Sequence, residues 1–155
     1  MGFLKKSFRA LARIIANHCL IHSLRILLFK LSGIDIGKNA YINLEFLVID
    51  DYLGNMLIIE DEVAIAPRVT IINISNPNES FIGREYKISE QGVVHIKKGA
   101  WIGTGVIIQP GITIGKGSII GSGTVITRDV PNFAIVIGIP GKIIGDVREK
   151  YGKNK

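Results

Sequence analysis

The sequence has one cysteine, few aromatic residues and no acidic residue among its first 30 positions. The lone Cys19 has no internal disulfide partner, so a reducing compartment is expected. Aromatic residues make up 7% of the chain although 47% is hydrophobic, so isoleucine, valine and leucine must supply the core. Together with 18 glycines, this composition favours many short strands joined by tight turns over a helical bundle.

A long uninterrupted apolar run is also missing. The most apolar segment, residues 11–31, is broken by polar and charged side chains: Arg13, Asn17, His18, His22, Arg25 and Lys30. It is therefore too polar for a membrane span, and no secretory signal is recognised. The 155 residues are enough for one domain with a substantial core, expected in the cytoplasm.

The N-terminal 31 residues are predicted to be helical and basic. An apolar stripe at helical spacing contains Leu4, Phe8, Leu11 and Ile15, and a neighbouring basic face contains Lys5, Arg9 and Arg13. Two interpretations remain open: the segment packs on the body or on a neighbouring subunit, or residues 1–30 make peripheral contact with the inner face of the membrane. Nucleic-acid binding is not expected, because the basic residues lack interleaved aromatics and a known nucleic-acid-binding motif.

A six-residue repeat dominates the remainder of the chain. Isoleucine returns at every sixth position from Ile96 to Ile126, with glycines keeping the same period beside it. Ile36, Ile42 and Val48 share this spacing upstream, and Ile59, Ile65 and Ile71 do so in a shifted phase. The segment 51–57 would absorb the shift as a small loop. A fixed period of this length predicts a parallel β-helix, in which three hexamers close one coil and the isoleucines stack in columns.

The sequence thus divides into a helical segment 1–31, a β-helix 32–145 and a basic tail 146–155. The repeat is interrupted by a polar segment, 75–92, which is predicted to leave the coils as an extruded loop. A sandwich of short strands would not explain six uninterrupted periods.

The motifs in 101–142 (WIGTGVIIQPGITIGKG…TRDVP…GIPGK) resemble those of the hexapeptide-repeat acyltransferases. The similarity is greatest to the galactoside, maltose and polysaccharide O-acetyltransferase group, and it extends over about residues 24–145. This resemblance implies an all-β, left-handed parallel β-helix that assembles as a homotrimer, with acetyl-CoA bound between two subunits and no metal.

The resemblance also assigns expected roles to individual residues. Trp101 would border the reacting end of acetyl-CoA, and Arg128 and Lys142 would approach its phosphates. Small residues would lie along the pantetheine arm and offer backbone groups to it: Gly103, Thr104, Gly105, Ser122 and Gly123. The glycines also fit turn geometry alone, and a solvated surface role for Arg128 and Lys142 stays open.

The loop lacks the general base that the resemblance implies. Family members place a histidine before the loop proline, where it takes the proton of the acceptor hydroxyl. This chain has Asn76 before Pro77, and an amide does not accept a proton at neutral pH. His95 and Glu79 are the alternative bases. His18 and His22 lie in the N-terminal segment at a spacing typical of one helix face.

Three functions are compatible with the sequence. The first is an O-acetyltransferase acting on a hydroxyl of a sugar or glycan precursor, as in polysaccharide biosynthesis. The second is a catalytically weakened or inactive relative that binds CoA or serves in assembly. The third, a metal hydrolase of the γ-carbonic-anhydrase type, requires three histidines around one metal, and the coils contain only His95.

Overall fold

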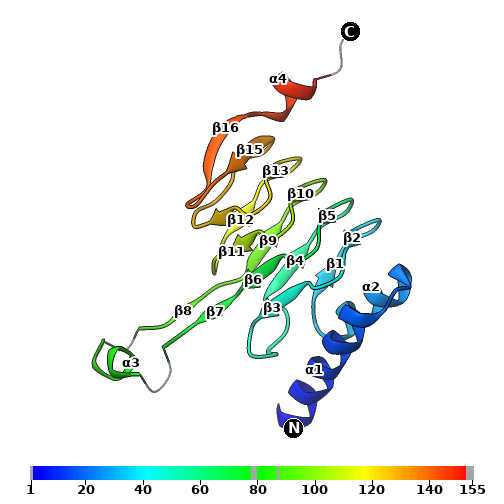
Figure 1. Cartoon of the computed structure of the whole chain (residues 1–155). Helices are drawn as coiled ribbons and strands as arrows, with labels where there is room; N and C mark the ends of the chain where they lie inside the picture. The colour runs from blue at the N-terminus through cyan, green and yellow to red at the C-terminus, as the bar shows by residue number, and fades with distance from the viewer. Residues whose placement is uncertain (1, 78–79, 87, 153–155) are drawn as a thin grey trace.

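The computed structural model describes residues 2–77, 80–86 and 88–152. Two helices open the chain, α1 (Gly2–His18) and α2 (His22–Leu31), and a stack of coils built from very short strands follows (Figure 1). Helices α1 and α2 lie at one end of the stack, and α4 (Val147–Tyr151) lies at the opposite end. The helices predicted for residues 1–31 are therefore present.

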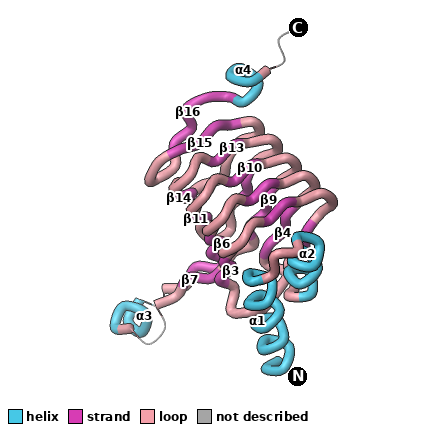
Figure 2. Tube along the Cα trace, turned by 45° about the vertical axis from the view of Figure 1, so that its right-hand side comes forward, coloured by secondary structure: helices cyan, strands magenta, loops and turns pink. Residues whose placement is uncertain are grey.

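The coils form three parallel faces. The first face contains β1 (Asp35–Ile36), β4 (Leu57–Ile59), β9 (Val94–Ile96) and β12 (Thr113–Ile114). The second contains β2 (Tyr41–Ile42), β5 (Ala64–Ile65), β10 (Trp101–Ile102), β13 (Ile119–Ile120) and β15 (Ala134–Ile137), with β16 (Lys142–Asp146) at its end. The third contains β3 (Leu47–Ile49), β6 (Thr70–Ile72), β11 (Ile107–Ile108) and β14 (Val125–Ile126). Figure 2 shows the successive coils from the side.

The strand register places the repeated isoleucines in columns inside the stack. On the first face Ile36 pairs with Ile59, Ile59 with Ile96, and Ile96 with Ile114. The side chains at the repeat positions are fully or almost fully buried on all three faces. The columns predicted from the six-residue spacing are thus confirmed, including the shifted phase upstream.

The corners of the coils require backbone with positive φ. On the edge between the second and third faces, Gly105 and Gly123 have φ of 69° and 70°. The same edge has Glu45 and Arg68 at φ 57° and 60° in the first two coils, where side chains tolerate the strain. An added Cβ at Gly105 or Gly123 would meet nothing within 4 Å, so the positive φ, and not a lack of space, favours glycine at these positions. The surface of the edge is therefore open.

The loop that absorbs the phase shift is held by α1. It consists of residues 50–56, because Leu57, the last residue of the predicted segment 51–57, already begins β4. Asp50 is 2% exposed and accepts hydrogen bonds from both terminal nitrogens of Arg13, at 2.6 and 2.9 Å. The backbone N–H groups of Tyr52 and Gly54 donate to the same carboxylate. Arg9 donates to the carbonyl oxygens of Tyr52 and Leu53. The basic face of α1, rather than its apolar stripe, is therefore the face that packs on the first coil.

The C-terminal end of the stack reverses direction. Strand β16 pairs antiparallel with β15, whereas the pairings between successive coils are parallel. On the first face, the Asp129 carboxylate accepts from the Thr113 N–H (2.7 Å). At the corner that follows this face, the Asn132 side-chain oxygen accepts from the Lys116 N–H (2.8 Å). Side chains thus occupy positions that carbonyls of a further coil would fill. The segment expected to be a basic tail, 146–155, contains α4, and residues 153–155 lie outside the described part.

Candidate functional site

The predicted loop leaves the stack as a hairpin. Strand β7 (Ile74–Ser75) pairs antiparallel with β8 (Glu90–Gln91), and helix α3 (Phe81–Tyr86) lies at the far end (Figure 1). The buried Asn73 closes the base, since its side-chain nitrogen donates to the carbonyl oxygens of Met56 and Gly92. The hairpin departs between the third and first faces, at a corner that we call the loop edge (Asn73, Gly92 and Gly111).

Asn76 lies just beyond β7 and is exposed. It lines a shallow depression of about 310 Å³ with residues of the third face and of the hairpin base, including Ile49, Ile72 and Ser75. Its side-chain amide can donate to or accept from a hydroxyl but cannot take up a proton at neutral pH. Glu79, one of the two alternative bases, falls outside the described residues.

The small residues assigned to the pantetheine arm stack on one corner. We call this corner, between the second and third faces, the glycine edge (103–105, 121–124 and Gly138). The N–H of Gly123 donates to the carbonyl of Thr104 (2.8 Å), and the N–H of Val125 donates to the carbonyl of Gly138 (3.1 Å). A Cβ at Gly103 would stand 2.7 Å from the backbone nitrogen of Ser122, so successive turns are in direct contact.

Several glycine N–H groups of the glycine edge donate within the stack. Gly103 donates to Ile120, Gly105 to Pro67, and Gly123 to Thr104. Carbonyl oxygens have a second lone pair, so those of this edge can still accept a hydrogen bond from a ligand. Such acceptors suit a ligand that carries amide N–H groups. Trp101 lies just before this edge, on the outer side of β10, and is 55% exposed.

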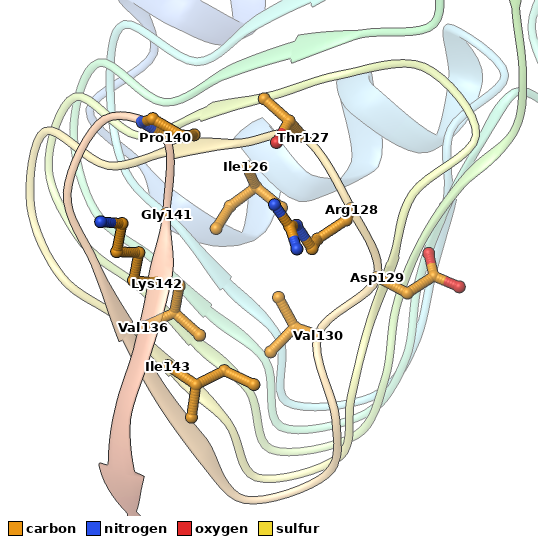
Figure 3. Close-up of a pocket in the computed structure, with 10 residues that line it drawn as sticks. All are labelled: Ile126, Thr127, Arg128, Asp129, Val130, Val136, Pro140, Gly141, Lys142 and Ile143. Atoms are coloured by element: carbon orange, nitrogen blue, oxygen red, sulfur yellow. The ribbon is translucent and has the colours of Figure 1, made fainter.

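Arg128 and Lys142 both line one cavity of about 300 Å³ at the C-terminal end of the stack (Figure 3). Apolar residues that close the core, Ile126, Val130 and Val136, also line it. Arg128 follows β14 on the loop edge, whereas Lys142 begins β16 just after the glycine edge. The structure thus brings together two cations that lie 14 positions apart in the sequence.

His95 lies on the outer side of the first face and has a carboxylate partner that sequence analysis missed. Its Nε2 is 2.7 Å from the Oε1 of Glu60, which directly follows β4 in the preceding coil. The backbone N–H of Lys98 donates to the other Glu60 oxygen (2.8 Å) and, with the His95 contact, holds the pKa of Glu60 below its ordinary value. The pairing leaves His95 Nδ1 as the nitrogen able to accept a proton.

The candidate residues therefore occupy different parts of one chain. The small residues lie on the glycine edge, and Trp101 lies just before it on the second face. Asn76 lies beside the loop edge, and His95 faces outward between the loop edge and the remaining corner. The third face separates the glycine edge from the loop edge within one chain. A site that uses both edges at one point needs the edge of a second molecule.

The described residues show neither a metal-binding cluster nor a membrane-spanning helix. Among the described residues, no three or more histidine, cysteine, aspartate or glutamate side chains are grouped so that they could hold a metal ion. The part of the chain that the structure describes contains no helix sufficiently long and apolar to cross a membrane.

The chain is similar to a family of bacterial transferases and to several acetyltransferase sequences. The family described as bacterial transferase hexapeptide (six repeats) matches residues 94–128. Galactoside O-acetyltransferase of Escherichia coli is 34% identical over 119 residues, which cover 77% of this chain and 57% of the relative. Nodulation protein L of Rhizobium meliloti is 42% identical over 113 residues, which cover 73% and 60%. The chain spans less than two thirds of the length of these curated relatives.

Solved structures extend the likeness to nearly the whole chain. A galactoside acetyltransferase in complex with coenzyme A superposes with a TM-score of 0.77 at 29% identity, covering 97% of this chain and 86% of that one. A maltose O-acetyltransferase from Clostridium difficile gives a TM-score of 0.68 at 26% identity, covering 92% and 86%. These likenesses confirm the parallel β-helix predicted from the repeat and its left-handed form, which the family resemblance implied.

Proposed function

The chain belongs to the hexapeptide-repeat acyltransferase family, and from that membership we propose that it transfers acetyl from acetyl-CoA to a hydroxyl of a sugar or glycan precursor. The likeness to a galactoside acetyltransferase in complex with coenzyme A carries this proposal. In the reaction, the acceptor oxygen attacks the thioester carbonyl, the carbon–sulfur bond breaks, and CoA leaves as its thiolate. The proton lost by the hydroxyl must pass to a base and finally to the thiolate.

The proposed binding mode runs along the glycine edge. The thioester end of acetyl-CoA lies beside Trp101, the arm follows 103–105 and 122–123, and the phosphates approach Arg128 and Lys142. The open space beside Gly105 and Gly123 and the free acceptor capacity of the carbonyls favour this path. Positive charge at the C-terminal end suits phosphate groups.

The proposed active site lies between subunits of a homotrimer. The hairpin of one subunit would reach the glycine edge of the next, since one chain presents these parts on different edges. Helix α3 exposes Phe81, Ile82 and Tyr86 at 66%, 51% and 70%, and such apolar side chains suit contact with a neighbouring subunit. Asn76 would orient the acceptor hydroxyl by its amide.

The presence of Asn76 at the position expected for the base favours a second candidate function. Because Asn76 replaces the base expected in the loop, the trimer could bind CoA without turnover and act in assembly. The His95–Glu60 pair is the alternative general base. It would support catalysis if the trimer brings the Nδ1 of His95 beside the acceptor hydroxyl bound at a neighbouring subunit.

The assembly has a direct test. We expect sedimentation equilibrium at micromolar concentration to give three times the 16.9 kDa mass of one chain. Replacing Phe81 and Tyr86 by serine should weaken the trimer if the hairpin crosses to a neighbour. A native protein that remains monomeric would contradict the proposed intersubunit site.

Binding of CoA tests the cation pair. We expect Arg128→Ala with Lys142→Ala to raise the Kd for CoA at least about tenfold, because each charged hydrogen bond contributes about 1.5–3 kcal/mol. Added salt should weaken binding to the native protein. Isothermal titration calorimetry measures both effects.

A charge-matched control is available at the other end of the stack. Lys30→Ala with Lys38→Ala removes the same charge from exposed side chains, and CoA affinity should stay near that of the native protein. Equal losses in both double variants would mean that net charge matters and that the cavity has no specific role.

A further inference from the structure

Helix α1 packs with its polar side inward and its apolar side outward. Arg9, Ala12, Arg13 and Ala16 are its buried residues. The opposite side exposes six large apolar side chains by 47–82%: Phe3, Leu4, Phe8, Leu11, Ile14 and Ile15. An amphipathic helix on a globular body usually buries its apolar side, so this arrangement is inverted.

The orientation of α1 is fixed by specific contacts. The Arg13–Asp50 pair is buried on both sides, with 7% and 2% side-chain exposure. Further along the helix, Asn17 donates to the carbonyl of Phe46 and accepts from its N–H, both at 2.9 Å. Rotation of α1 to bury its apolar stripe would break all of these bonds and leave Asp50 buried without its partner. The apolar side therefore stays outward unless something else covers it.

Helix α2 continues the same surface. It packs beside α1 and buries Arg25 and Phe29. Its opposite side exposes Leu24, Leu27 and Leu31 by 42–51%, and the connecting segment exposes Leu20 and Ile21. These five residues and the six of α1 together form what we call the apolar cap surface. Exposed apolar area of this extent marks an interaction site rather than ordinary surface.

The charges around the apolar cap surface discriminate between its possible partners. Lys5, Lys6 and Lys30 are exposed on the two helices, and no acidic residue precedes Asp35. Two copies joined through this surface would bring their lysines together without a carboxylate from the same segment to offset them. A layer of anionic headgroups over an apolar interior instead complements both the lysines and the apolar side chains.

We propose that the apolar cap surface binds an anionic phospholipid bilayer, with α1 lying in the interface plane. A 17-residue helix is about 25 Å long, which allows its six outward side chains to enter the headgroup and acyl boundary together. The β-helix then stands on the membrane by its N-terminal end, and the hairpin and the C-terminal cavity remain in water. This binding goes beyond acetyl transfer and does not depend on it.

The test is co-sedimentation of the full chain with vesicles of phosphatidylglycerol and phosphatidylcholine, compared with phosphatidylcholine alone. We expect the native protein to bind the anionic vesicles and to bind neutral ones less. Phe8→Gln, Leu11→Gln and Ile15→Gln together should lower the partition coefficient at least about tenfold, since each side chain loses apolar burial in the bilayer. Lys5→Gln with Lys6→Gln should reduce the preference for anionic lipid.

A matched control and a second readout complete the design. Tyr151→Gln removes one similarly exposed large side chain (61%) at the opposite end and should leave vesicle binding unchanged. In Phe8→Trp the emission should shift to the blue on addition of anionic vesicles, above the constant contribution of Trp101.

Three outcomes would overturn the lipid proposal: absence of native binding to anionic vesicles, unchanged binding by the triple variant, or dissociation of the native oligomer in that variant without vesicles. The last would assign the surface to a contact between copies. CoA affinity measured without vesicles should be equal in all variants, so failure of the lipid proposal is distinguishable from failure of the proposed acetyl transfer.

Discussion

Asn76→His should raise the rate of acetyl transfer to a sugar acceptor by about 10² to 10⁴, the contribution of a positioned general base. The position is exposed, so an imidazole fits without disturbing the core. The hairpin base is closed by Asn73 and does not depend on the side chain at 76. The measurement is kcat/KM with acetyl-CoA and a panel of sugar acceptors, over a pH range that includes the ordinary histidine pKa of about 6.5.

The controls separate the possible bases. Asn76→Gln keeps an amide and should give no gain. Suppose that Asn76→His has no effect while His95→Ala and Glu60→Gln both abolish transfer. In that case the base is the His95–Glu60 pair, and Asn76 contacts the acceptor without taking part in proton transfer. If native protein and Asn76→His are both inert with every acceptor while CoA still binds, the enzymatic proposal loses its main support and the assembly function is favoured.

Arg13→Met should destabilise the folded protein by about 3–5 kcal/mol, because it leaves the carboxylate of Asp50 buried without its cation. Asp50 also accepts hydrogen bonds from the N–H groups of Tyr52 and Gly54, so the loop 50–56 should become less ordered together with α1. Urea unfolding at one fixed protein concentration measures the change, since assembly shifts apparent stability.

A double-mutant cycle tests whether the pair acts as a unit. Arg13→Met with Asp50→Asn removes both charges and should destabilise less than the sum of the two single variants. Lys6→Met is the matched control, because Lys6 is exposed on the same helix; its effect should stay within about 0.5 kcal/mol. Additive losses in the cycle would mean that the pair has no special coupling.

The sequence was sufficient for the coils. A residue such as Ile102 is identified as buried by its position in a period of six, and the register confirms that it stacks on Ile65 and Ile120. The prediction of burial succeeds because each repeat packs only against the neighbouring repeats, so the spacing of apolar residues is enough to identify the buried positions. The extruded loop was predictable for the same reason, as the segment where the period stops.

The packing of α1 was not predictable from the local pattern. Periodicity shows two faces on the helix, but the choice between them depends on Asp50, which lies 37 positions from Arg13. The small side chains of Ala12 and Ala16 allow the helix to approach the first coil closely enough for that pair to form. The partner of His95 was missed in the same way, because Glu60 lies one coil away and 35 positions earlier. Spacing within a hexamer does not show which polar groups meet between coils.

The reversed strand at the C-terminal end has a consequence for the solubility of the protein. A stack of parallel coils has no intrinsic length, and an open last coil is a template on which another chain can add. Antiparallel pairing of β16 with β15 occupies the edge of the second face. Asp129 accepts from an N–H group of the first face, and Asn132 accepts from one at the corner after it. The helical cap covers the other end. End-to-end growth into fibres is thereby blocked at both ends of the stack. Side-by-side contact between the β-helices of different chains therefore remains the available way for the protein to form oligomers.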